Sequence, residues 1–158
     1  MSIKSIVTNI KELRISCLAV EKDEDIKQII IDLKDTLEST KGLGLSANQI
    51  GYNKRISYLK VPIKVDPKTK EIEYTELILI NAKIMEKIKP VKLMNEACLS
   101  FPGMTVTTQR YIFIVVENHN EKLEVNTMLL QDNESFVCQH ELDHLAGKTL
   151  LDREWRAK

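Results

Sequence analysis

The sequence is 158 residues long, which is the usual size of one compact domain, and 43% of its residues are hydrophobic, enough to build a core without disulfide bonds. We therefore predict a single domain over residues 1–158. The 23 Lys and Arg residues balance the 23 Asp and Glu residues, giving a formal net charge of zero. Proteins that bind nucleic acids without sequence preference depend on a positive field, so we expect no direct nucleic-acid binding.

The apolar runs are too short to predict a membrane or secretory segment. The run from Leu77 to Ile80 is typical of the longest ones, whereas a membrane-spanning helix needs about 18 apolar residues. Near the amino terminus, the apolar stretch from Ile15 to Val20 ends at Glu21 and is shorter than the roughly 7–15 residues of a secretory signal. We expect no membrane association and a cytoplasmic location.

The first element in chain order is an amphipathic helix predicted over residues 22–39. Asp, Lys and Glu occupy one of its faces, and apolar side chains recur at helical spacing on the other. These apolar residues are Ile26, Ile29, Ile30, Leu33 and Leu37. Gly42 provides a stop signal after the helix.

Strand-like segments rich in β-branched and aromatic residues follow. They span residues 55–61, 74–80, 84–92 and 104–116. Turn residues at 66–68 join the first two segments, and turn residues at 118–122 follow the last. A second helix is predicted over residues 134–145, closed by Gly147, where left-handed backbone angles are commonly needed. This order of elements favours an α+β fold over an alternating parallel sheet.

The strongest functional signal is the run His-Glu-Leu-Asp-His at positions 140–144, inside the second predicted helix. Residues four apart project from one face of a helix, so His140 and His144 can share a metal ion. Glu141 lies one step round the helix, where it can take a proton from a bound water without being a ligand. The alternative is a solvated helix face. Because the chain has only three histidines, we favour the metal site.

A catalytic metal site normally has three protein ligands and one open position, so a third ligand is needed. A metzincin-type site would take it from position 150, which is Leu150. A thermolysin-type site would take it from a Glu on a further helix, and the short remaining chain offers only Glu154. The third ligand is therefore predicted to come from upstream.

The three cysteines are candidates for that ligand, because a thiolate suits zinc or iron(II) and an odd number argues against a disulfide framework. Cys138 lies about 200° round the helix from His140, and Cys17 lies in an apolar patch, so we predict both in the core. Cys98 lies in a break between strand-like runs, where a loop can present it to a metal, and buried packing is its alternative role. His119 falls in a predicted turn and is expected to face solvent.

Three separated segments resemble the motifs of the peptide deformylase family, in the right order and at similar spacings. They are Gly-Leu-Gly-Leu-Ser-Ala-Asn-Gln at 42–49, Glu-Ala-Cys-Leu-Ser at 96–100, and Gln-His-Glu-Leu-Asp-His-Leu-Ala-Gly at 139–147. The resemblance implies antiparallel or mixed β-sheets packed around a metal-binding helix. It also implies a metal-dependent hydrolase that removes the formyl group from N-formylmethionine of nascent polypeptides, an N-terminal processing step of protein biosynthesis.

The resemblance further implies a ligand set and a general base. Cys98, His140 and His144 match the family's three protein ligands, with water in the fourth position. It implies one divalent metal per chain, iron(II) in the natural state, with zinc, nickel or cobalt also accepted. Glu141 matches the residue that takes the proton from water and then protonates the departing α-amine.

Oxyanion donors are implied in the same way. The side-chain amide of Gln49 and the backbone N–H of Leu99 match the groups that the family uses. Gly42 and Gly44 have no Cβ to block the close approach of a strand-like peptide substrate. Ser46 is a departure, since the first motif usually has alanine at this position.

The methionine side chain of the substrate needs an apolar pocket beside the metal. Phe136 and Val137 lie on the ligand-bearing face of the predicted helix. Leu43 and Met94 match the facing walls, and general core packing is an equal alternative for each of these residues. Ala97 stands where the family usually has glycine, and its methyl group lies next to the expected path of the substrate.

Two other functions stay open at this point. A general metallopeptidase is disfavoured by the missing downstream ligand and by Cys98. A deformylase-like metal- or peptide-binding protein with little turnover is disfavoured by Glu141 and Gln49, which metal binding alone does not need, whereas Ala97 leaves room for it. The sequence lacks the long carboxy-terminal helix of many bacterial members, so the ribosome is a weaker expected partner than the formylated nascent chain.

Overall fold

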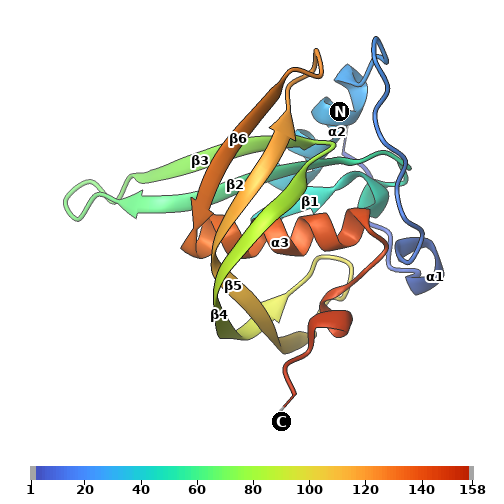
Figure 1. Ribbon diagram of the computed structural model, residues 1–158. Helices are drawn as coiled ribbons and strands as arrows, with labels where there is room; N and C mark the ends of the chain where they lie inside the picture. Colours follow the sequence, from blue (N-terminus) through green and yellow to red (C-terminus); the bar gives the residue numbers. More distant parts are fainter. Residues whose placement is uncertain (1–2, 157–158) are drawn as a thin grey trace.

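The computed structural model describes residues 3–156. Within this range the strands form two three-stranded antiparallel sheets, with the orders β1-β2-β3 and β4-β5-β6. Helix α3 (Asp132–Leu145) contacts β1 and β2 of the first sheet and β5 and β6 of the second (Figure 1). The helix with the His-Glu-Leu-Asp-His run thus lies between two antiparallel sheets, and the predicted α+β fold is confirmed.

The first sheet contains β1 (Gly44–Ser46), β2 (Ile56–Val65) and β3 (Ile72–Ile80). The chain turns between β2 and β3 at Asp66, whose side chain accepts hydrogen bonds from the backbone N–H groups of Lys68 and Thr69 at 2.8 and 3.1 Å. The turn predicted at 66–68 is confirmed. Both long strands extend beyond their predicted ends toward this turn, because their side chains are exposed there and the hydrophobic alternation fades.

The second sheet contains β4 (Lys83–Ala97), β5 (Thr105–His119) and β6 (Val125–Gln131). The sequence analysis missed β6, in which only Leu130 is buried, so the alternation that predicts a strand is absent. The prediction for His119 is wrong. It ends β5, half-buried, with its ring Nδ1 3.2 Å from the carbonyl oxygen of Ile80.

Strand β4 continues to Ala97 because a bulge lets it change direction without ending. Its register with β5 shifts between Leu93 and Glu96, and Asn95 has a φ of +59°. A bulge of this kind re-aims the side chains that follow it. Cys98 therefore follows the strand directly, rather than lying in a longer break as the sequence predicted.

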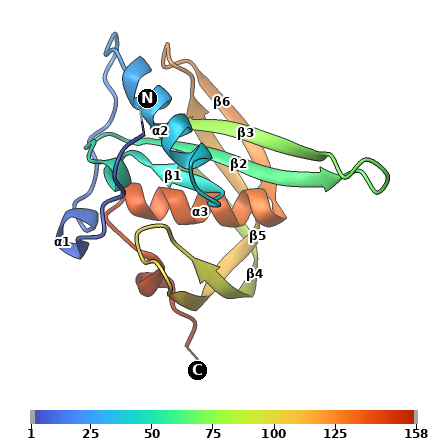
Figure 2. The same cartoon turned by 180° about the vertical axis from the view of Figure 1, so that it is seen from behind.

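Helix α2 (Lys27–Glu38) begins later than the apolar pattern predicts. Asp23 has a φ of +64°, and the N–H of Glu24 bonds to the carbonyl of Glu21, so the preceding residues form a turn. The helix ends at Glu38 with Ser39 as its C-cap, within one residue of the predicted end. Its apolar face packs on β1 and β2 (Figure 2) and forms a first core cluster with them.

Helix α3 begins at Asp132, two residues before its predicted start, and Gly147 follows it with the expected positive φ of +74°. Three short helical segments that the sequence did not predict are α1 (Ile10–Leu13), η1 (Ala47–Ile50) and η2 (Leu150–Arg153). No helix in residues 3–156 is both long and apolar enough to cross a membrane.

A second core cluster lies between the two sheets and α3, and it contains Cys17 and Cys138. The prediction that both are core residues is confirmed. Burial raises the pKa of Cys17 to about 11 and that of Cys138 to about 12, so both thiols stay protonated at neutral pH. Neither cysteine is free to compete with Cys98 for a metal.

Candidate metal centre

Three buried side chains from two parts of the chain meet beside helix α3. His140 and His144 lie one turn apart on the helix, and Cys98 follows the end of β4. The Sγ atom of Cys98 is 3.2 Å from Nε2 of His144, which is itself 3.2 Å from Nε2 of His140. The three ligand atoms all lie within 4.8 Å of one another. The structure thus brings together the three residues that the sequence analysis selected as ligands.

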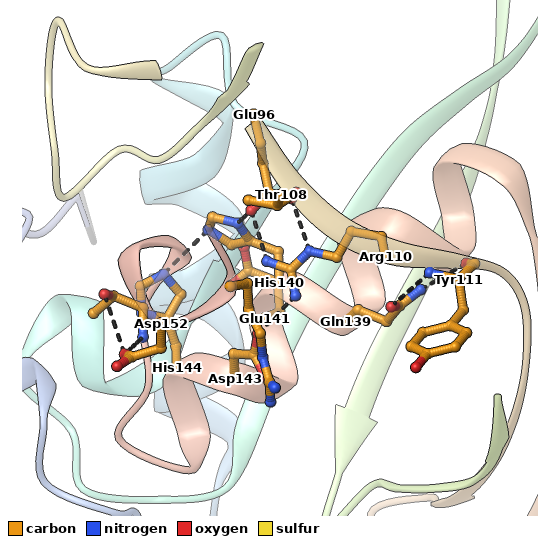
Figure 3. A network of polar contacts seen from close by, with 12 residues as sticks. Glu96, Thr108, Arg110, Tyr111, Gln139, His140, Glu141, Asp143, His144 and Asp152 are labelled. Atoms are coloured by element: carbon orange, nitrogen blue, oxygen red, sulfur yellow. Dashed lines mark hydrogen bonds and ion pairs between the residues drawn. The ribbon is translucent and has the colours of Figure 1, made fainter. Parts of the chain in front are cut away.

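One flank of the centre is built from charged groups. Oε2 of Glu96 lies 2.8 Å from Nδ1 of His140, the ring nitrogen that faces away from the cluster. Arg110, which is only 2% exposed, donates to both oxygens of Glu96 and to Asp143 (Figure 3). Arg153 of η2 holds the other side of Asp143 at 3.0 Å. These four residues, Glu96, Arg110, Asp143 and Arg153, are called the ionic flank below.

The charges on this flank support one another. Burial alone would raise the pKa of Glu96, but the hydrogen bonds from Arg110 and His140 outweigh it and lower the pKa to about 2. Burial would lower the pKa of Arg110, and Glu96 and Asp143 raise it instead. Glu96 is therefore a carboxylate at neutral pH, and it fixes the ring of His140 in one orientation.

The two histidines differ in protonation even though their rings touch. Burial, assisted by the charge of His140, lowers the pKa of His144 to about 3. For His140, burial would lower the pKa as well, but contacts with Cys98 and Glu96 outweigh it and raise the pKa to about 10. These opposite shifts favour a proton on His140 over one on His144. A divalent cation would take its place, because ligating histidines are neutral.

The donor set fits a metal of the zinc or iron(II) type. A thiolate and two imidazoles leave one coordination position open, which is typical of catalytic sites. His140 has the carboxylate partner that ligating histidines usually have on their second nitrogen. The Nδ1 atom of His144 is buried and has no hydrogen-bond partner among residues 3–156, so no hydrogen bond on that nitrogen orients the ring. The cluster is a Cys/His/His metal site.

The opposite flank is built around Glu141 and uncharged groups. This residue is 3% exposed, and its Oε2 accepts a hydrogen bond of 2.7 Å from the hydroxyl of Ser46. Its Oε1 lies 4.0 Å from Nε2 of His140, on the side of the cluster. Burial raises the pKa of Glu141, while the charge of His140 and the hydrogen bond from Ser46 oppose this rise. Glu141 is thus close to the ligands without being one of them.

Gln49 lies beside the same cluster, at the third position of η1. Its Nε2 donates to Oγ of Ser100 at 3.1 Å and lies 3.7 Å from Sγ of Cys98. Its Oε1 accepts from the backbone N–H of Ser46 at 2.9 Å, so the NH₂ end faces the cluster. Ser46, Ser100 and Gln49, together with Glu141 and Ser57, are called the neutral flank below.

The glycines of the first motif make room for side chains of the protein itself, whereas the sequence analysis assigned them to the approach of the substrate. A Cβ atom on Gly44 would lie 2.9 Å from Cγ of Glu141 and from Cγ1 of Val137, and one on Gly42 would lie 2.8 Å from Cδ1 of Leu99. The missing Cβ atoms therefore leave room for the protein's own side chains around the site. In particular, Gly44 lets β1 lie directly against the carboxylate-bearing turn of α3.

A cavity of about 410 Å³ opens beside the cluster. The residues expected at the substrate that do line it are Leu43, Gly44, Ala97, Phe136 and Val137, together with Leu99, Gln49, Cys98, His140 and Glu141. Met94 does not line it and is 63% exposed, so its placement as a pocket wall is corrected. The bulge between Leu93 and Glu96 turns Leu93 into the cavity instead.

Several residues around the centre were missed by sequence reasoning. Glu96 stands inside the second motif but was given no role, although a carboxylate near a ligating histidine is a common partner. Ser100 also stands inside that motif and had no predicted role, whereas Arg110 carries no local signal, because it reaches the site only through the pairing of β4 with β5. Lys41 and Asn133 also line the cavity and were not predicted.

Comparison with known proteins agrees with this geometry. The sequence model of the family described as "Polypeptide deformylase" matches residues 3–158. A peptide deformylase of Aquifex aeolicus is 38% identical over 138 residues, covering 86% of this chain and 78% of the relative. One of Elusimicrobium minutum is 37% identical over 130 residues, covering 82% and 73%.

Solved structures give the same result. The crystal structure of a peptide deformylase from Ehrlichia chaffeensis in complex with actinonin superimposes with a TM-score of 0.86 at 33% identity, covering 99% of this chain and 91% of that one. A plant peptide deformylase superimposes with a TM-score of 0.83 at 28% identity, covering 97% and 80%. The similarity thus extends over nearly the whole chain, including both sheets and α3.

Proposed function

The chain belongs to the peptide deformylase family, and from this premise we propose how its own residues carry out the reaction. It is a metallohydrolase with peptide deformylase activity, and formylated peptides are its substrates. The proposed reaction is hydrolysis of the formyl amide of N-formylmethionine at the start of a nascent polypeptide, which yields formate and a free α-amine. We place this reaction in the cytoplasm, with any contact to the ribosome secondary to binding of the nascent chain.

Cys98, His140 and His144 would hold one divalent metal, which we propose to be iron(II), with zinc, nickel and cobalt as substitutes. Bound there, the metal would supply a Lewis acid that lowers the pKa of water toward neutrality. The protein's part is to hold the three ligand side chains in place around this site. Glu96 contributes by accepting from Nδ1 of His140, which leaves Nε2 of that ring available as the ligand atom.

Glu141 is the proposed proton carrier. Its Oε1 faces the ligand cluster, and burial raises the pKa of Glu141, which makes the carboxylate a stronger proton acceptor. In the first half of the reaction it takes a proton from the attacking water as the new C–O bond forms. In the second half it gives that proton to the α-amine as the C–N bond breaks. One carboxyl group therefore serves as base and then as acid.

The developing oxyanion on the formyl group needs fixed hydrogen-bond donors. The NH₂ end of Gln49 faces the cluster because Ser46 and Ser100 hold both ends of its amide. The backbone N–H of Leu99, the residue after Cys98, is the second proposed donor at the cavity wall. Donors that are fixed before the reaction stabilise the transition state without reorganisation, and removing one costs about 10²–10³ in kcat in other enzymes.

The methionine side chain of the substrate is assigned to the apolar part of the cavity. Phe136 and Val137 lie one turn before His140 on α3, and Leu43 lies across from them beside β1. Ala97 and Leu93 bring the end of β4 to the same space. This arrangement places an apolar binding site next to the reacting group, as the substrate requires.

The observation that carries this proposal is a buried Cys/His/His cluster with a buried, non-ligating glutamate beside it. Its test is the release of formate from a formyl-Met dipeptide by protein loaded with iron under anaerobic conditions. We expect turnover that declines on exposure to air, because oxidation of the iron or of Cys98 removes the activation of water. An iron-loaded, folded protein without turnover would contradict the proposal and favour a deformylase-like binding protein.

A further inference from the structure

Ser46 lies where the two proposed catalytic side chains meet. It ends β1, is fully buried, and precedes η1, which carries Gln49. Its hydroxyl lies 2.7 Å from Oε2 of Glu141, 2.9 Å from the carbonyl oxygen of Glu141, and 2.7 Å from the hydroxyl of Ser57. Its backbone N–H donates to Oε1 of Gln49 at 2.9 Å. One residue therefore contacts the carboxylate through its side chain and the amide through its backbone.

We propose that Ser46 is a positioning residue for deformylation in this chain, and that its hydroxyl holds the carboxylate of Glu141 with Oε1 directed at the reacting centre. The inference rests on the proposed role of Glu141 as proton carrier. It goes further by assigning a function to a residue at which the first family motif usually has alanine.

The hydrogen-bond inventory explains how the proton of Ser46 comes to be available to Glu141. A hydroxyl has one proton to donate, and both atoms that it meets on Glu141 are acceptors when the carboxyl group is ionised. Ser57 is the residue opposite Ser46 in the antiparallel pairing of β1 with β2. When the Ser57 hydroxyl donates to Oγ of Ser46, the proton of Ser46 is left for Glu141. A short chain of hydroxyl groups thus ends on Oε2.

The hydrogen bond from Ser46 determines the orientation of the Glu141 carboxylate, because few other groups contact that carboxylate. Among residues 3–156, the hydroxyl of Ser46 is the only hydrogen-bond donor to the Glu141 carboxylate. Gly44 and Val137 limit the carboxylate sterically on one side, since a Cβ atom on Gly44 would lie 2.9 Å from Glu141 and from Val137. Packing therefore limits the position of the Glu141 side chain. The hydroxyl of Ser46 holds one carboxylate oxygen, so the other oxygen faces His140.

The two contacts of Ser46 can be separated by experiment. Ser46→Ala removes the hydroxyl but keeps the backbone N–H that holds Gln49. The Ser46 side chain also takes part in a capping box with the backbone of Gln49, so the double-mutant cycle with Glu141→Gln decides whether a loss of kcat arises through Glu141. We expect kcat on a formyl-Met dipeptide to fall about tenfold, since hydrogen bonds to charged groups are the stronger class, with KM changed less than about twofold.

Ser135→Ala is the matched control. This serine is also fully buried and lies on α3, but its hydroxyl donates to the carbonyl of Tyr111 and does not contact Glu141. The variant removes a buried hydroxyl of the same size and is expected to keep kcat within about twofold. Ser57→Ala is a second test, because it removes the hydroxyl that contacts Oγ of Ser46 without touching Glu141, and where Ser57 is the donor in that contact a fall in kcat of about threefold is expected.

The experiment combines Ser46→Ala with Glu141→Gln in a double-mutant cycle, with metal content and Tm measured for every variant. We expect Ser46→Ala to lower kcat in the parent protein and to have no further effect on kcat in Glu141→Gln. If the role of Ser46 were only structural, Ser46→Ala would lower Tm, and its effect on kcat would not depend on whether Glu141 is present.

The possible results distinguish the proposed role of Glu141 from the proposed role of Ser46. If Glu141→Gln keeps its turnover, the proposed role of Glu141 is wrong. If Glu141→Gln is inactive while Ser46→Ala matches Ser135→Ala in kcat, the role of Glu141 stands and the inference about Ser46 is overturned. Should Ser46→Ala fail to fold, Ser46→Gly takes its place, since it also lacks the hydroxyl and keeps the backbone N–H, and a kcat equal to that of Ser135→Ala would overturn the inference.

Discussion

The two flanks of helix α3 use different kinds of polar contact at similar depth. On the ionic flank, Arg110 bridges Glu96 and Asp143 through charged hydrogen bonds of 2.6–2.8 Å. On the neutral flank, Glu141 is a buried carboxylate that, among the described residues, receives one hydroxyl group and no cation at hydrogen-bond distance. The two kinds of surroundings shift the pKa values of the two carboxyl groups in opposite directions. Full pairing lowers the pKa of Glu96, whereas burial raises the pKa of Glu141.

This contrast indicates a division of labour across the helix. A carboxylate that is paired with arginine keeps its charge and its place, which suits the orientation of a metal ligand. A carboxylate whose pKa burial has raised accepts a proton more readily than an exposed one, which suits proton transfer. The ionic flank is thus the holding side of the site, and the neutral flank is the reacting side.

The largest expected effect concerns the ligand that joins the flanks. Cys98→Ala should lose both metal and activity, because two imidazoles alone are an incomplete site. Cys138→Ala should keep both, since Cys138 lies in the second core cluster and loses only packing. Metal analysis and formate release on the two purified variants provide the measurement. Equal losses in both variants, or loss only in Cys138→Ala, would overturn the ligand assignment.

The second prediction breaks the ionic flank at its centre. Arg110→Met removes the cation and leaves Glu96 and Asp143 buried without their main partner, which should lower the free energy of unfolding by about 3–5 kcal/mol. Denaturant unfolding of metal-free protein measures this. Ser135→Ala, which deletes a neutral buried group on the same helix, should cost about 1–3 kcal/mol. Equal destabilisation would mean that the charges on this flank carry no special weight.

The smallest of these effects concerns the apolar cavity between the flanks. Replacing methionine by glycine in a formyl dipeptide removes apolar contact of about 1.5–3 kcal/mol, so kcat/KM should fall at least about tenfold. Steady-state kinetics with the two dipeptides gives the ratio. Similar values for both would show that Phe136 and Val137 do not form a methionine site.

The sequence predicts the two histidine ligands and the proposed proton carrier of α3 well, because they share one helix turn. His140 and His144 follow from helical spacing alone, and Glu141 follows from its place between them. Cys98 required elimination of other ligands and a family resemblance. The reason is that its position depends on where β4 ends, and the bulge that extends this strand has no clear signature in the sequence.

Polar contacts between residues far apart in the sequence could not be predicted from local patterns. Arg110 reaches Glu96 through the pairing of β4 with β5, and Ser46 reaches Glu141 across 95 positions of the chain. Strand β6 was missed for a related reason, because it is held by its pairing with β5 and buries little of its own surface. Local patterns identify elements and motifs, but not which polar groups a fold places together.

The division of labour is tested most directly by one pair of matched variants. Glu96→Gln and Glu141→Gln each replace a largely buried carboxylate by an amide of the same shape, on opposite flanks of α3. Metal affinity and kcat at saturating metal are measured for both. We expect Glu96→Gln to lose about 10–100-fold in metal affinity with kcat largely retained. Glu141→Gln should keep its metal affinity and lose about 10²–10⁴-fold in kcat. The same profile for both variants, or a Glu141→Gln protein that turns over normally, would contradict the account.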